Sequence, residues 1–303
     1  MPALPDVDVY VECLRRDVVG AKLIGVRLAS PFLLRSVTPP ITSVAGRRVA
    51  GVRRLGKRIV FDLEDDLHLV IHLMIAGRFA WDKPGTRIPR KVGLVGFDFE
   101  TGTLLLREAG SKKRASLHVA TDEGMAEFDR GGLEVLDAPL GVFRDALTRE
   151  NHTLKRSMTD PRILSGIGNA YSDEILHRAG LSPLKQTSRL SADEIETLWQ
   201  ATRATLEEWR DRLVAEAGDG WPRKVTAFRP EMAVHGRYGK DCPACGSPVQ
   251  RIVYAQNECN YCAACQNQGR LLADRALSRL LKKDWPRNLE ELGEMRRPLG
   301  ERT

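Results

Sequence analysis

Four cysteines near the C-terminal end constrain this chain more than any other feature. They form two C-x-x-C pairs separated by residues 246–261, and they are Cys242, Cys245, Cys262 and Cys265. Each pair places two thiolates at one tight turn, and a connection of this length lets the turns face each other around one tetrahedral ion. All four coordination positions are then filled by protein. The spacing therefore predicts a structural Zn²⁺ site.

The residues between the two pairs read as two short strands, Gln250–Tyr254 and Asn260–Tyr261, so we expect a zinc-stapled β-hairpin. The alternative is a pair of disulfides, which needs an oxidising compartment. Residues 1–6 have no basic-then-apolar run typical of a secretory signal. The chain also has no uncharged span of about 18 residues, which a transmembrane helix would need. We therefore expect a cytosolic protein with reduced thiols and no membrane partner.

The other two cysteines have different predicted roles. Cys13 lies in an apolar pattern of helical spacing, which is typical of a buried small hydrophobic residue. Cys259 lies three residues before Cys262 and can compete as a zinc ligand. We expect it outside the ligand set, but the sequence leaves its role open.

Composition favours a globular protein with a polyanionic partner. The 303 residues are 42% hydrophobic and 29% charged, which is enough to bury a substantial core. Lys and Arg outnumber Asp and Glu by 47 to 40, and the formal net charge is +7. The basic residues cluster in the sequence, and the alternative to phosphate contacts is a solvated charged face. The clusters are Arg53, Arg54, Lys57 and Arg58; Lys112, Lys113 and Arg114; Lys155 and Arg156; and Arg223 and Lys224.

Periodicity divides the chain into a β-rich part and a helical part. An amphipathic helix is expected over residues 7–18, and period-two runs then predict a β-sandwich or barrel. These runs are Lys22–Leu28, Val49–Leu55, Arg58–Leu63, Leu67–Trp81, Val92–Phe99, Thr103–Arg107 and Ala115–Val119. Helices are expected from about Pro139 onward: Leu140–Asn151, Leu154–Met158, Pro161–Leu164, Ala170–Arg178 and Ser191–Ala217, the last starting with a Ser191–Glu194 capping box.

We accordingly expect a multidomain α+β protein. Residues 1–132 form the N-terminal helix and β-sandwich, residues 133–225 a helical DNA-binding domain, residues 226–275 the zinc-finger β-hairpin and residues 276–303 a loosely held tail. Within the helical part lies the motif Gly166-Ile167-Gly168-Asn169-Ala170-Tyr171. Its glycines allow a sharp turn into a helix whose free N-terminal amides suit a phosphate. The alternative is that Asn169 only caps its own helix.

Together these features resemble the formamidopyrimidine-DNA glycosylase and endonuclease VIII family. The likeness runs from residue 1 to about residue 275, and no single motif decides it. It rests on the order and spacing of Leu4-Pro5-Asp6-Val7, Leu55-Gly56-Lys57, Ile71-His72-Leu73, Gly166–Tyr171, Glu174, Arg178-Ala179-Gly180 and Val234-His235-Gly236-Arg237. The resemblance implies a β-sandwich, a helix-two-turns-helix domain and a zinc hairpin.

The resemblance also implies a mechanism. Met1 is removed, and the secondary amine of Pro2 attacks C1′ of a damaged nucleoside, giving a Schiff base and then strand cleavage by β- and sometimes δ-elimination. A terminal amine titrates near pH 8, so part of it is neutral and nucleophilic at pH 7. Lys57 and Asn169 fall where the family binds phosphate, and Lys155 is a further candidate DNA contact. Whether Met1 is removed is left open.

The departures from the family pattern matter as much as the matches. Ala3 stands where the family has a glutamate that acts as general acid and base, so we expect base excision to be impaired. Pro2 attack on an existing abasic site does not need that acid, and we do not expect Asp6 to replace it. The sequence leaves open whether Ala3 is native or engineered.

Three further departures concern DNA contacts. Asn257 replaces a phosphate-binding arginine of the zinc hairpin, so affinity and its salt dependence should be lower. Ile75 takes the place of the residue that fills the gap left by a flipped nucleotide. The loop Glu108–Arg114 has Ser111, Lys112 and Lys113 where relatives have an Arg-Phe pair, which favours single-stranded or distorted DNA.

The sequence thus predicts a monomeric DNA-repair glycosylase and abasic-site lyase of the bacterial cytosol. Two alternatives stay open: a protein that binds abasic or distorted DNA without turnover, which Ala3 favours, and a zinc-ribbon protein of transcription or translation, which needs no free Pro2. The damaged base, the opposite-base preference and the balance of β- and δ-elimination are not predicted.

Overall fold

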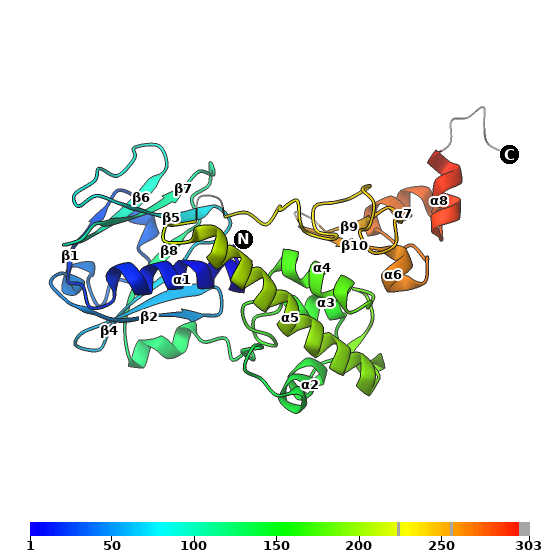
Figure 1. The fold of residues 1–303 in the computed structure, drawn as a ribbon, viewed down its shortest axis with the longest axis horizontal. Helices are drawn as coiled ribbons and strands as arrows, with labels where there is room; N and C mark the ends of the chain where they lie inside the picture. The colour runs from blue at the N-terminus through cyan, green and yellow to red at the C-terminus, as the bar shows by residue number, and fades with distance from the viewer. Residues whose placement is uncertain (223–224, 255–256, 297–303) are drawn as a thin grey trace. The chain divides into compact units, whose positions relative to one another are not determined.

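The computed structural model describes residues 1–222, 225–254 and 257–296, so the basic pair Arg223 and Lys224 lies outside the described residues. Contacts divide the chain into two compact units. Unit 1 comprises Met1–Gly132 and Glu207–Thr226, and unit 2 comprises Leu133–Leu206 and Ala227–Thr303. The long helix α5 (Ala192–Ala217) contributes to both units (Figure 1). The division into four domains stays a prediction.

Unit 1 opens with the predicted amphipathic helix, α1 (Leu4–Val18). Pro5 lies in the first turn, where its missing N–H costs nothing, and Asp6 lies in the same turn, where a carboxylate favours the helix dipole. Val7, Leu14 and Val18 are fully buried. The helical spacing of these apolar residues therefore places one face of α1 in the core.

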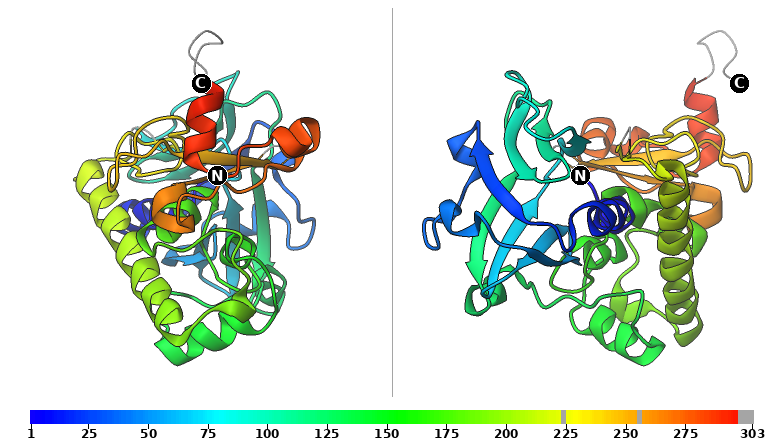
Figure 2. Two further views of the ribbon diagram at one scale, coloured as in Figure 1. Left: turned by 90° about the vertical axis from the view of Figure 1, so that its right-hand side faces the viewer. Right: turned by 60° about the vertical axis from the view of Figure 1, so that its left-hand side comes forward.

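A β-sandwich makes up the rest of unit 1, as predicted. Its two four-stranded sheets are antiparallel, with the orders β1-β6-β7-β5 and β2-β3-β4-β8. Figure 2 draws these strands in blue to blue-green. The strands are β1 (Leu23–Leu28), β2 (Val49–Leu55), β3 (Arg58–Leu63), β4 (Leu67–His72), β5 (Gly77–Asp82), β6 (Gly93–Phe99), β7 (Thr103–Glu108) and β8 (Ser116–Thr121). Phe61 of one sheet stacks on Phe97 of the other, so the two inner faces share one core.

Two predicted elements differ from the structure. The run Leu67–Trp81 is not continuous: it breaks at residues 73–76, and β4 and β5 belong to different sheets. Met74 adopts a left-handed conformation (φ 51°), which ends the β pattern without a glycine at that position. Pro161–Leu164 forms a turn and a bridge to residue 133 rather than a helix.

The segment after α5 packs on the sandwich core of unit 1. Trp221 stacks on Trp81 with ring centroids 6.1 Å apart, and its indole N–H donates to Asp17 at 2.7 Å. Arg78 donates to the carbonyl oxygen of Val225 at 2.7 Å. Trp221 and Val225 therefore belong to the sandwich although the helical region precedes them in sequence.

Unit 2 contains helices and the predicted hairpin. The helices are α2 (Leu140–Thr148), α3 (Leu154–Thr159), α4 (Asn169–Arg178), part of α5, α6 (Ala263–Asn267), α7 (Arg275–Leu281) and α8 (Leu289–Arg296), and the hairpin pairs β9 (Gln250–Tyr254) with β10 (Asn257–Tyr261). Helices α2 to α5 lie at predicted places, whereas the sequence analysis did not predict α6, α7 and α8. The capping box before α5 is present, since Ser191 Oγ accepts the Glu194 N–H at 3.2 Å and Glu194 accepts the Ser191 N–H at 2.9 Å. Helices α7 and α8 lie in the region predicted to be a loose tail.

The first basic cluster is partly neutralised inside unit 1. Arg53 contacts Asp62 at 3.0 Å, and Arg54 contacts Asp8 at 2.8 Å. Two of its members therefore form ion pairs within unit 1, which differs both from free phosphate-binding residues and from a solvated charged face. Among the described residues, no helix is long and apolar enough to cross a membrane.

Candidate active site and metal centre

The N-terminal amine lies in a charged environment of unit 1. Met1 is 44% exposed, while Pro2 and Ala3 behind it are buried. Burial lowers the pKa of the α-amine, the charges of Arg78 and Lys57 lower it further, and Asp6 opposes them. The amine is therefore more often neutral at pH 7 than an exposed terminus, which is the form in which nitrogen acts as a nucleophile.

Two neighbouring side chains of the sandwich lie near this amine. Lys57 lies in the turn between β2 and β3, where Gly56 takes a positive φ of 61°, and burial lowers the pKa of Lys57 to about 8. Next to it, β3 and β4 pair so that Arg58 is opposite His72. Burial lowers the pKa of His72 to about 4, helped by the charges of Arg58 and Lys57. The imidazole is thus neutral at pH 7 beside a cationic lysine.

Position 3 offers no proton-transfer group. Ala3 is 2% exposed and forms the N-cap of α1, and its backbone N–H donates to the Asp6 carboxylate at 3.1 Å. Asp6 itself is only 3% exposed. The nearest acid in the sequence is therefore engaged in closing the first turn of α1.

The turn between β4 and β5 presents Ile75, which is 55% exposed. Gly77 is required here, because a Cβ at this position would lie 2.3 Å from the Leu73 carbonyl oxygen. The guanidinium of Arg78 donates to the carbonyl oxygens of Ile75 and Gly77 at 3.2 Å and 2.6 Å. The turn is thus fixed while the Ile75 side chain stays accessible.

The loop that follows β7 lies beside this turn. A Cβ added at Gly110 would lie 3.8 Å from the Cβ of Ala76. The buried carboxylate of Glu108 accepts the backbone N–H groups of Arg114 and Ala115, at 2.9 Å and 3.1 Å, and so closes the loop. Residues 111–114 are all exposed, and three of the four are cationic. The loop therefore adds positive charge, and no aromatic ring, next to Ile75.

In unit 2 the predicted phosphate-binding residues have partners inside the protein. The ammonium of Lys155 donates to the Asn169 carbonyl at 2.8 Å, to the Ser172 hydroxyl at 2.7 Å and to Asp173 at 2.5 Å. These contacts use its three protons. Asn169 is the first residue of α4, as predicted, but its side chain does not cap that helix; it donates to the Glu258 carbonyl at 2.7 Å. Asn257 begins β10 and is exposed.

Two adjacent acids of α4 hold the segment that precedes the first cysteine pair. Glu174 accepts three backbone N–H groups, from Ala233, Val234 and His235, at 2.7–2.9 Å. Asp173 lies 2.7 Å from His235 Nδ1. Both acids are buried, so their hydrogen bonds offset the cost of removing carboxylates from water.

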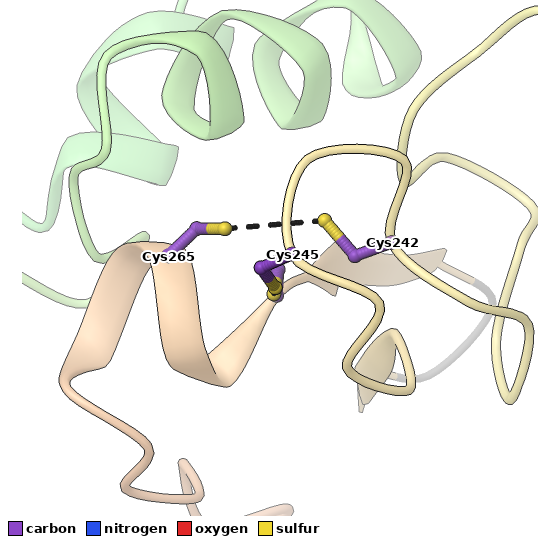
Figure 3. A group of neighbouring side chains, drawn as sticks. Cys242, Cys245 and Cys265 are labelled. Carbon is purple, nitrogen blue, oxygen red and sulfur yellow. Dashed lines mark hydrogen bonds between the residues drawn. The ribbon is translucent and has the colours of Figure 1, made fainter.

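The four predicted zinc ligands come together in unit 2. The sulfur atoms of Cys242, Cys245, Cys262 and Cys265 all lie within 4.8 Å of one another. Figure 3 shows Cys242, Cys245 and Cys265 of this cluster. Cys242 and Cys262 are buried, and Cys245 is exposed. Four thiolates at this spacing are the donor set of a closed tetrahedral Zn²⁺ site, so this cluster can hold a metal ion.

The other two cysteines are placed as predicted. Cys13 is 4% exposed in a small apolar cluster with Val9 and Leu213. Cys259 is 1% exposed and is not part of the cysteine cluster found among the described residues. Burial raises the pKa of the Cys259 thiol, and the nearby charge of Asp173 raises it further. Cys259 therefore behaves as a buried neutral thiol.

Comparison with known proteins assigns the chain to a family. The family model of the formamidopyrimidine-DNA glycosylase N-terminal domain matches residues 1–114, and that of the H2TH domain matches residues 133–210. A formamidopyrimidine-DNA glycosylase of Thermus thermophilus is 34% identical, over 89% of this chain and 100% of the relative. The chain belongs to the formamidopyrimidine-DNA glycosylase family. A relative from Chloroflexus aggregans is 30% identical over 88% of this chain and 98% of its own length.

Solved structures of the formamidopyrimidine-DNA glycosylase family share the fold. Lactococcus lactis Fpg in complex with DNA containing an abasic site has a TM-score of 0.77 and 23% sequence identity, over 88% of this chain and 99% of that one. The same enzyme with DNA containing FAPY-dG has a TM-score of 0.77 and 22% identity, over 87% of this chain and 99% of that one. The predicted fold class is therefore confirmed.

Sequence reasoning did not name two residues of the amine environment as site residues. His72 is identified by its register opposite Arg58, a pairing that follows once the β3–β4 turn is placed at residues 64–66. Arg78 is identified by its charge effect on the α-amine. Its role depends on the break after β4, which the sequence pattern did not indicate.

Proposed function

We propose that this chain is a DNA-repair glycosylase and abasic-site lyase in which the amine of Pro2, freed by removal of Met1, is the nucleophile. The observation that carries the proposal is the α-amine whose pKa is lowered by burial and by Arg78 and Lys57. Membership of the formamidopyrimidine-DNA glycosylase family supports the same assignment. Removing Met1 would take that amine away and leave a secondary amine on Pro2, a residue that is itself buried.

The proposed lyase reaction follows from amine chemistry. The neutral nitrogen of Pro2 adds to C1′ of the ring-opened abasic sugar, water leaves, and a cationic Schiff base forms. The positive charge on this nitrogen makes the C2′ proton acidic, and loss of that proton expels the 3′ phosphate by β-elimination. Lys57, with its ammonium near the amine, would hold the flanking phosphate.

Base excision should be impaired because position 3 has no acid. Protonating a departing base or opening the sugar ring needs a group such as glutamate, and Ala3 has no transferable side-chain proton. The Asp6 carboxylate is engaged with the Ala3 N–H. The missing acid at position 3 and the engagement of Asp6 also favour the alternative function, a protein that binds abasic or distorted DNA without turnover.

The proposed DNA contacts lie in both units. In unit 1 they are Lys57 for phosphate and Ile75 for the gap left by a flipped nucleotide. In unit 2 they are Asn169, Asn257 and Lys155, and because Lys155 and Asn169 have internal partners, phosphate binding would have to exchange or add to those bonds. The neutral Asn257 would contribute less to affinity than an arginine.

The loop beside Ile75 bears on substrate form. Lys112 and Lys113 are exposed and cationic, and neither can stack on or wedge beside an opposite base. We therefore propose a preference for single-stranded or distorted DNA, in which unstacking a nucleotide costs less.

The four cysteines would hold structural Zn²⁺. We further propose a monomer that acts in the bacterial cytosol.

Borohydride trapping on DNA with a single abasic site tests the proposal. We expect a covalent adduct when Pro2 is free and none when its amine is acetylated, because borohydride traps a Schiff base and an acetylated nitrogen cannot form one. Trapping should be at least as efficient on single-stranded DNA as on duplexes, whichever base stands opposite the abasic site. Tight DNA binding without an adduct would favour the non-catalytic alternative, and strict dependence on an opposite cytosine would contradict the strand preference.

DNA affinity should depend on pH through Lys57. Burial lowers the pKa of Lys57 to about 8 in the free protein, and a bound phosphate favours the charged form. Binding then takes up a proton, so affinity should be constant below pH 8 and fall by up to about tenfold per pH unit above it. Titration of a fluorescent abasic-site analogue from pH 6.5 to pH 9.5 measures this slope.

Two variants separate Lys57 from other pH effects. Lys57→Arg keeps its charge throughout this range, so its affinity should not show the slope. Lys83→Gln removes an exposed lysine just beyond the end of β5. A strand of this length puts Lys83 roughly 20 Å from Gly77, at the start of β5, so this variant should keep the dependence of DNA affinity on pH. An equal slope in wild type and Lys57→Arg would show that another group takes up the proton.

A further inference from the structure

One face of helix α4 carries side chains that all contact the zinc hairpin or the segment leading to it. Asn169 bonds the Glu258 carbonyl, Asp173 accepts the Asn260 N–H at 3.1 Å, and Glu174 accepts three N–H groups of residues 233–235. His177, at the last turn, completes this row, since positions 169, 173, 174 and 177 are spaced to lie on one face of the helix. Helix α4 is thus bonded along its length to the metal-binding part of unit 2.

The contact made by His177 reaches a predicted metal ligand. Its Nε2 lies 3.2 Å from Sγ of Cys242, within the distance of a hydrogen bond to sulfur. A metal-bound thiolate can only accept a hydrogen bond, so the imidazole must donate. His177 is not among the residues whose ligand atoms cluster as a potential metal site in the described structure.

We propose that His177 is a positioning residue of the four-cysteine metal centre. Its Nε2–H hydrogen bond to Cys242 stabilises the metal-bound thiolate. The same bond couples metal binding to helix α4. The proposal rests on the structural zinc included in the proposed function. It assigns to this chain a residue outside the four cysteines that contributes to metal affinity.

The physical reason is the charge of the loaded centre. Four thiolates around one Zn²⁺ leave two net negative charges, and Cys242 is only 2% exposed, so water contributes little to stabilising its sulfur. An N–H donor lowers that cost and fixes the direction of the Cys242 side chain. Residues that bond a metal ligand in this way typically change metal affinity by about 10–100-fold when replaced.

The test is a competition titration of the full-length protein with a chromophoric chelator of known Zn²⁺ affinity. His177→Phe removes the donor and keeps an apolar ring of similar size, whereas His177→Gln keeps an N–H donor. We expect His177→Phe to bind Zn²⁺ about 10–100-fold more weakly than wild type, and His177→Gln to recover most of that loss. His152→Gln is the matched control, because His152 contacts Glu150 rather than a cysteine and should not change the affinity.

Co²⁺ substitution distinguishes a positioning residue from a ligand. If His177 only donates to sulfur, the visible spectrum of the Co²⁺ protein should be that of four thiolates in wild type and in His177→Phe alike. A spectrum in wild type that changes in His177→Phe would make the imidazole a ligand and overturn the proposal. Unchanged Zn²⁺ affinity in His177→Phe would overturn it as well.

Hydrogen exchange tests the coupling to α4. Chelating the metal from wild type should speed amide exchange in α4 as well as in the hairpin, since the bond from His177 is lost together with the order of Cys242. In metal-loaded His177→Phe, exchange in the last turn of α4 should already be faster. Exchange in α4 that is indifferent to chelation would contradict the coupling. Zinc content and exchange are read without any glycosylase or lyase assay, so a failure here is distinguishable from a failure of the proposed function.

Discussion

Replacing Ala3 by glutamate is expected to raise the rate of base excision from duplex DNA by about 10²–10⁴-fold, the usual contribution of a positioned general acid or base. The backbone at this position is already set: Ala3 caps α1, and its N–H is bound by Asp6 whichever side chain it carries. The new carboxyl group would belong to the residue directly after Pro2, whose amine is proposed to attack C1′. Single-turnover release of the damaged base from DNA containing FAPY-dG, the lesion in the Lactococcus lactis Fpg complex, measures the gain.

Ala3→Gln is the control for this experiment, because glutamine has nearly the size of glutamate and cannot transfer a proton. It should excise no faster than the unaltered chain. Trapping on a pre-formed abasic site should change far less than excision in Ala3→Glu, since that reaction has no base to release. If Ala3→Gln gains as much as Ala3→Glu, proton transfer is not the cause. If neither gains while DNA binding and trapping persist, Ala3 is not the only defect.

The elements that the sequence predicted well are those with local signals. The Ser191–Glu194 capping box depends on residues three apart, and both of its hydrogen bonds are present. The C-x-x-C pairs likewise form a cluster, because tight turns and a hairpin bring them together without any distant partner. Interactions of this kind join residues that are close together in the sequence, so the spacing of the residues predicts them.

The elements that the sequence missed depend on tertiary context. The β4–β5 break falls in an almost continuously apolar run, and it is set by Met74 in a left-handed conformation and by the passage from one sheet to the other. Residue chemistry predicted Lys155 as a DNA contact, but it could not indicate that Asp173 and Ser172 already accept its protons. Such partners come together only when α3 packs against α4.

Loss of the metal is expected to unfold the hairpin region of unit 2 while unit 1 stays folded. The apolar cluster around the metal centre contains only Val234 and Val249 besides cysteines, among its buried described members, so apolar packing contributes little to holding the two C-x-x-C turns together. Structural Zn²⁺ contributes about 10–16 kcal/mol to folding of comparable small zinc-binding peptides near pH 7. The sandwich has a large core of its own. Calorimetry with chelator should therefore show a separate, low-temperature transition, and DNA affinity should fall by more than about 100-fold.

Two serine substitutions on one short segment give this prediction a matched control. Cys262→Ser removes a member of the sulfur cluster, whereas Cys259→Ser changes a buried cysteine three residues earlier that lies outside it. We expect Cys262→Ser to lose Zn²⁺ and DNA binding, and Cys259→Ser to keep one Zn²⁺ per chain, because the neutral Cys259 thiol interacts with Asp173 and lies outside the sulfur cluster. Metal content by atomic emission and DNA affinity decide between them. Loss of Zn²⁺ in Cys259→Ser, with Cys262→Ser retaining it, would mean that Cys259 is the ligand and that the hairpin register differs from the one described.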